Sequence, residues 1–75
     1  MFALELVRGE ETRTFSVRDA GASGWELTEK ANGQPVRTVQ YSDWHRVERA
    51  ISIILLRADA LEQEGWRALG LARKV

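Results

Sequence analysis

The stretch from Ser42 to Trp66 constrains this chain most, because it predicts one long amphipathic helix with a signal at each end. Ser42 is the predicted N-cap, since its hydroxyl can accept a hydrogen bond from a free N–H of the first turn. Asp43 would place a negative charge at the positive end of the helix dipole. Gly65 suits the left-handed position after a last turn, with Leu61 placed for the hydrophobic contact of that motif.

Most apolar residues of this helix fall on one face at about 100° per residue. They are Trp44, Val47, Ala50, Ile51, Ile54, Leu55, Ala58 and Leu61. A stripe this broad predicts a core-facing surface.

A second apolar stripe, formed by Ile53, Leu56 and Ala60, lies on roughly the opposite side of the helix. Charged residues border it: Arg46, Arg49, Arg57 and Glu64. Single exposed apolar side chains are normal, so the stripe can be scatter. Two large apolar residues one turn apart on the wrong face favour a self-association surface instead. We therefore predict an interface of Ile53, Leu56 and Ala60, with Arg49 and Arg57 at its rim.

Four segments before the helix alternate in the manner of strands. They are Met1–Arg8, Thr12–Arg18, Trp25–Lys30 and Pro35–Tyr41. The inward residues of the first three are Phe2, Leu4, Leu6, Phe15, Val17, Trp25 and Leu27. Asn32 and Gly33 predict a type I′ turn before the fourth strand. The sequence does not decide which face of that strand points inward, because Val36 has one parity while Val39 and Tyr41 have the other.

Together these elements predict a single α+β domain over residues 1–75. Its fold class is a four-stranded antiparallel β-meander followed by one long α-helix packed on one face. Residues 67–75 are predicted either to add a short strand or to fray.

The composition limits the chemistry available to this chain. Seventy-five residues make a small domain with a thin stability margin, and such domains often gain stability by dimerising. There is no cysteine and only one histidine, so no metal site of the usual Cys/His kind is expected. The absence of cysteine and of an apolar span predicts a cytoplasmic protein without a membrane segment.

No cofactor site and no catalytic group are expected. Ser42, Asp43 and His45 are close in sequence but point in different directions at a helix start, which does not suit a catalytic triad. Gly21 and Gly24 precede no helix, so the logic of a phosphate-binding loop fails.

Three functions remain open from the sequence. The favoured one is a small non-catalytic interaction module that forms a homodimer through the second stripe. A weak single-stranded nucleic-acid binder is the alternative, with candidate contacts from Arg13, Arg18, Lys30 and Arg37 on the sheet. The formal net charge of zero counts against it, since nucleic-acid binders usually carry a basic excess. An unidentified protein partner is the third, because an exposed apolar stripe serves a foreign partner equally well.

Overall fold

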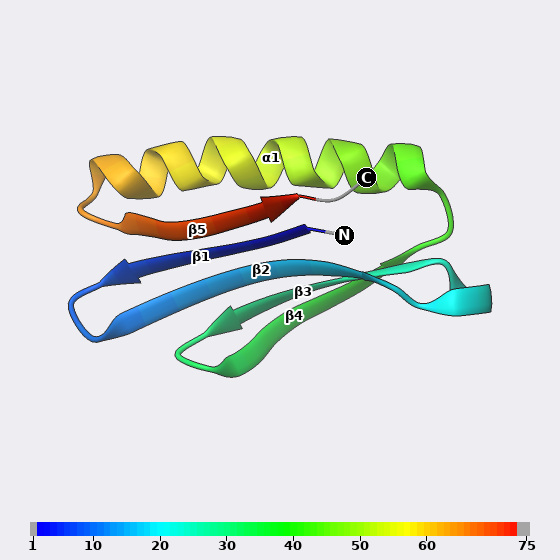
Figure 1. Ribbon diagram of the computed structural model, residues 1–75, viewed down its shortest axis with the longest axis horizontal. Coiled ribbons are helices and arrows are strands. Elements are labelled where there is room, and N and C mark those ends of the chain that lie inside the picture. Colours follow the sequence, from blue (N-terminus) through cyan, green and yellow to red (C-terminus); the bar gives the residue numbers. More distant parts are fainter. Residues whose placement is uncertain (1, 74–75) are drawn as a thin grey trace.

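The computed structural model describes residues 2–73, in which one helix lies across one face of a five-stranded antiparallel sheet (Figure 1). The strands are β1 (Phe2–Arg8), β2 (Glu11–Asp19), β3 (Trp25–Ala31), β4 (Gln34–Tyr41) and β5 (Arg67–Arg73). A 3-10 turn (Gly21–Ser23) joins β2 to β3, and the helix α1 spans Trp44–Gln63. The strand order β4-β3-β2-β1-β5 confirms the predicted meander followed by a helix.

The fifth strand is the main addition to the predicted fold. After α1 the chain returns beside β1, where Val7 pairs with Arg67 and Phe2 pairs with Arg73. The first strand is therefore an interior strand of the sheet, between β2 and β5. Of the two predictions for the tail, the extra strand is right for residues 67–73, and residues 74–75 lie outside the described residues.

Alternation along the strands directs apolar side chains toward the helix, as the sequence predicts. The buried apolar residues of the sheet are Phe2, Leu4, Leu6, Phe15, Val17 and Leu27. The helix contributes Val47, Ile51, Ile54 and Ala58, with Trp44, Ala50, Leu55 and Leu61 partly buried around them. The predicted core face of the helix is thus confirmed, and burial of these side chains is the main force holding α1 to the sheet.

The two ends of α1 differ in how well the sequence predicted them. Ser42 is not the N-cap; the helix begins one residue later, and the Asp43 carboxylate accepts a 3.0 Å hydrogen bond from the His45 N–H. Asp43 has the extended backbone of an N-cap, and its side chain is among those preferred there. At the other end Gly65 is left-handed (φ 100°), and the Trp66 N–H donates to the Leu61 carbonyl at 3.0 Å, as predicted.

The register of β4 resolves the face that the sequence left open. Tyr41 pairs with Trp25 and Val39 pairs with Leu27, so Tyr41 and Val39 lie on the helix side. Arg37 shares their parity and pairs with Glu29.

Each edge strand carries a register shift that leaves one residue without a partner. In β4 the extra residue is Val36, because Glu29 pairs with Arg37 while Lys30 pairs with Pro35. In β5 the extra residue is Leu69, which is skipped between Gly70 and Ala68 in the pairing with β1. Such bulges are common at sheet edges and turn a side chain away from the regular ladder.

Candidate interaction surfaces

The second stripe of α1 lies on the face of the helix that points away from the sheet. Ile53 is 58% exposed and Leu56 is 69% exposed, and Ala60 is also exposed. The structure therefore brings these three predicted interface residues together on one solvent-facing surface, which we call the outer stripe.

Charge along the outer side of α1 runs against the helix dipole. Arg46 and Arg49 lie in its N-terminal half, and Glu64 lies at its C-terminal end. The first turn contains no acidic residue and the last turn contains no basic one in this fully described helix. Charges in these positions do not gain the stabilisation of about 0.3–1 kcal/mol that the opposite arrangement provides. The Arg8 guanidinium partly compensates by donating to the Glu64 carbonyl at 3.4 Å.

Arg57, the second predicted rim residue, is directed toward the sheet. Its guanidinium lies 3.6 Å from Glu29 Oε1, while Arg13 lies 3.7 Å from Glu29 Oε2. Glu29 is only 8% exposed, so its carboxylate has to be balanced by nearby positive charge. Arg57 also lies over the Phe15 ring, 5.6 Å from its centroid. We call this group the Glu29 cluster.

A small cavity of about 90 Å³ adjoins the Glu29 cluster. Arg37 and Tyr41 from β4 line it together with Glu29 and Arg57. Glu29 was not among the residues predicted to matter, although its parity with Trp25 and Leu27 places it on the inward face. The arrangement explains how one acidic and several basic side chains are accommodated under the helix.

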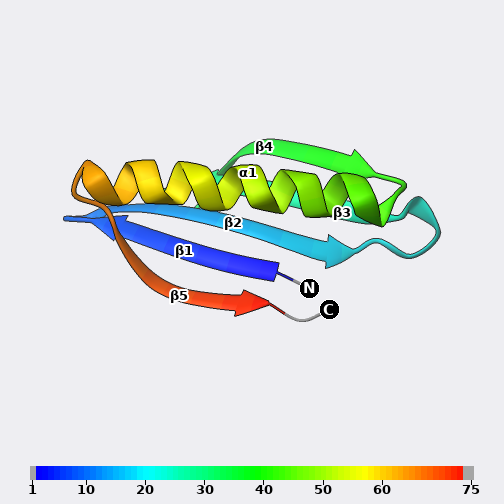
Figure 2. The ribbon, with the colours of Figure 1, turned by 90° about the horizontal axis from the view of Figure 1, so that it is seen from above.

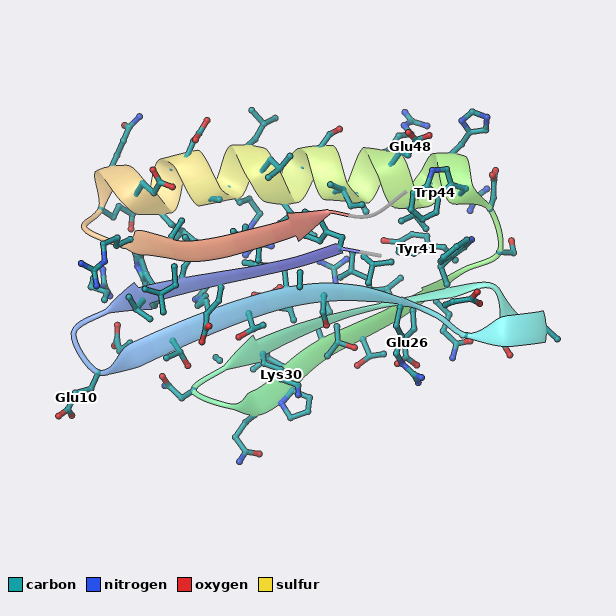
Figure 3. All side chains as sticks on the ribbon, viewed as in Figure 1. Glu10, Glu26, Lys30, Tyr41, Trp44 and Glu48 are labelled. Atoms are coloured by element: carbon teal, nitrogen blue, oxygen red, sulfur yellow. The ribbon has the colours of Figure 1, made fainter. Side chains whose placement is uncertain are left out.

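The four basic residues proposed for nucleic acid are divided between the two faces of the sheet. Arg13 and Arg37 lie on the helix side, within or beside the Glu29 cluster. Arg18 and Lys30 lie on the open face, where Figure 3 shows Lys30 and Glu26 extending away from α1. Arg18 donates to Glu26 at 2.8 Å, and this hydrogen bond lowers the pKa of the Glu26 carboxyl below its ordinary value.

Aromatic side chains gather on the helix side. The Trp25 and Trp44 rings have centroids 4.6 Å apart, and Figure 3 shows Trp44 and Tyr41 between α1 and the sheet. Trp66 is buried, with the Arg8 guanidinium 4.8 Å from its ring centroid. On the open face, short polar side chains form the central row, in which Ser16 pairs with Thr28 and Thr28 pairs with Thr38. This face offers bases no aromatic platform among the described residues.

A shallow apolar groove of about 530 Å³ runs along the other flank of α1, between the helix and the β1–β5 edge. Its lining residues are Leu4, Ser52, Leu55, Leu56, Ala58, Asp59, Glu62 and Ala68. Asp59 and Glu62 form no ion pair with any residue among 2–70, and over the same residues no basic side chain lines the groove. We call it the β5 groove. The β5 residue that lines it, Ala68, has a small side chain.

Features that would indicate metal or membrane chemistry are missing from the described part of the chain. His, Asp and Glu side chains within residues 2–73 do not gather into a group that could hold a metal ion. His45 is exposed, 3.9 Å from Glu48. Over the same residues no helix has the length and apolar character needed to cross a membrane.

Comparison with models of protein families, with curated proteins and with solved structures found no match. The function has to be argued from the surfaces described above.

Proposed function

We propose that this protein is a small, non-catalytic cytoplasmic interaction module that forms a homodimer through the outer stripe of α1. The observation that carries the proposal is the exposure of Ile53 and Leu56, at 58% and 69%, on a helix that packs its opposite face on the sheet. Apolar area left in water at such positions is recovered when a second copy covers it.

The other exposed large apolar residues have a structural explanation that the outer stripe lacks. Val36 and Leu69 are the unpaired residues of the two edge-strand bulges. Ile53 and Leu56 lie in the regular middle of a helix, where the chain is free to carry polar residues at no cost to the fold. Their presence there favours a binding role.

The charge pattern on α1 supports a second copy in antiparallel orientation. If a two-fold axis passes midway between Ile53 and Leu56, Arg46 of one helix and Glu64 of the other lie at nearly the same distance from it. At a rise of about 1.5 Å per residue these distances are about 13 Å and about 14 Å along the helix. Arg46 near each N-terminus then faces Glu64 at the C-terminal end of the partner helix. Charges that oppose the dipole of their own helix become complementary across the interface.

Single-stranded nucleic acid is less well supported as a partner. Its four candidate residues lie on opposite faces of the sheet, and Arg13 and Arg18 are engaged by Glu29 and Glu26. A stacking platform requires aromatic rings beside basic residues on one open surface. The aromatic residues of this fold instead pack toward the helix.

Analytical ultracentrifugation of wild type and Ile53→Glu across a concentration range tests the homodimer. We expect a concentration-dependent dimer for wild type and a monomer for Ile53→Glu. A dimer of the variant would have to bury two unpaired carboxylates, one from each copy. Val36→Glu is the matched control, since Val36 is also β-branched, is equally exposed at 58%, and lies on β4 away from the helix. A wild-type monomer throughout, or equal effects of the two substitutions, would contradict the proposal.

A further inference from the structure

The free edge of β5 and the adjoining β5 groove form one continuous surface. β5 ends the sheet order, so its outer edge has no neighbouring strand within the described residues. In Figure 2, α1 lies over the middle of the sheet and leaves β5 uncovered at the side. Leu4 from β1 and Ala68 from β5 line the groove beside this edge, and the helix supplies its opposite wall.

The two edges of the sheet differ in how they are protected against pairing. β4 carries Pro35, which lacks an N–H donor, and polar side chains such as Arg37, Thr38 and Gln40. β5 reads RALGLAR: its five central residues contain no proline and no charge. Both edges have a bulge that presents an apolar side chain, Val36 on β4 and Leu69 on β5, so the difference between them lies in the proline and the polar side chains of β4. An exposed apolar edge of this kind favours pairing with another strand.

We propose that the β5 edge binds an extended segment of a different protein, which adds to the sheet as a sixth strand. Main-chain hydrogen bonds to β5 hold the segment, and its alternate side chains enter the β5 groove. The groove dictates their chemistry. Its floor and helix wall, including Leu4, Leu55 and Leu56, accept apolar side chains. Asp59 and Glu62, which lack ion-pair partners among residues 2–70, favour a lysine or arginine at the end of the segment near Ala68.

A second copy of this chain fits the β5 edge less well. Antiparallel self-pairing centred on Gly70 sets Arg67 opposite Arg73 at both ends of the ladder. Like charges directly opposite each other on neighbouring strands are destabilising. The occupant we infer is therefore a foreign basic and apolar strand, on a surface separate from the homodimer apart from the shared Leu56.

The test measures binding of fluorescein-labelled probe peptides by anisotropy, using the full chain and repeating the titration with Ile53→Glu. The probe KTVTVTV presents lysine and valines at alternate positions; ETVTVTV reverses the charge, and KTVPVTV interrupts the strand. We expect the lysine probe to bind about tenfold more tightly than the glutamate probe, because two carboxylates face that position. We expect the proline probe not to bind detectably.

Two protein variants locate the site. Asp59→Lys should weaken binding of the lysine probe by about fivefold, as expected for loss and reversal of one exposed charge pair. Glu48→Lys is the matched control, with the same change of charge on the same helix but outside the groove, and should leave binding unchanged. Bound probe should also slow hydrogen exchange of amides in β5.

Equal binding of the three probes, or equal effects of the two lysine substitutions, would overturn the proposal. The proposal would also be overturned if, without any probe, hydrogen exchange of the β5 amides slowed as protein concentration increased and did so in Ile53→Glu as well. That result would place a second copy of this chain on the β5 edge. Probe binding by a monomeric wild-type protein would support the strand site while removing the homodimer.

Discussion

Glu29 shows how much one residue can organise in a fold of this size. It lies on an inward strand position that would ordinarily hold an apolar side chain, and it contacts Arg57 from the helix and Arg13 from β2. The carboxylate therefore ties three elements together. Without it, two guanidinium groups would face the core with no opposite charge.

We expect Glu29→Gln to lower the free energy of unfolding by about 1–2 kcal/mol. Breaking a fully buried pair costs more, but both arginine side chains here remain partly in contact with water. Urea denaturation at neutral pH measures the change. Glu10→Gln is the control, because Glu10 is an exposed carboxylate in the β1–β2 turn (Figure 3) and should shift stability by less than about 0.5 kcal/mol. Equal effects of the two substitutions would mean that the ion pairs of Glu29 contribute no net stability.

The sequence contained part of the information about Glu29. Its parity with Trp25 and Leu27 already places it on the inward face of β3. Its arginine partners could not be found in that way, because Arg13 lies near it only through the pairing of β2 with β3 and Arg57 only through the placement of the helix. The same strand pairings place Arg13 and Arg37 on the helix side of the sheet and Arg18 and Lys30 on its open face.

Local sequence patterns predicted which helices and strands this chain forms better than they predicted the residues at which those elements begin and end. Alternation and helical spacing gave four strands and the helix, and Gly65 gave the end of the helix. The N-cap was misplaced by one residue, because Ser42 and Asp43 are adjacent and both are good caps. The fifth strand was left undecided, since its small side chains give a weak alternation and its pairing with β1 is non-local.

Reversing the charges at the two ends of α1 separates helix stability from association. Arg46→Glu and Glu64→Arg should each stabilise the monomer by about 0.3–1 kcal/mol, because each then complements the helix dipole. Each should also weaken the antiparallel dimer, by placing like charges opposite each other. Sedimentation velocity and thermal unfolding at low concentration measure the two effects.

The double variant Arg46→Glu/Glu64→Arg should recover dimerisation, because the charges again face their opposites across the two-fold axis. If the double variant associates no better than either single variant, the antiparallel arrangement is wrong. In a parallel dimer residue 46 would not face residue 64, so the double variant would gain no dimerisation over the single variants from this pair.

For the whole molecule, self-association should appear as stability that depends on concentration. A 75-residue chain without disulfides has a small core, and a second copy that binds only the folded state raises the midpoint of unfolding. We expect the thermal midpoint of wild type to rise as protein concentration increases, whereas that of Ile53→Glu stays constant. Scanning calorimetry over a hundredfold range of concentration provides the measurement, and a constant midpoint for wild type would argue for a monomer.

The position of β1 between β2 and β5 has a consequence for the order of folding. The first strand to be synthesised gains its second neighbour only from the last, since Phe2 pairs with Arg73. Closing a loop of that length costs more entropy than closing any hairpin of the meander. We therefore expect β1 to β4 and α1 to assemble first, with β5 docking afterwards. The strand that completes the sheet is then also the one from which unfolding starts.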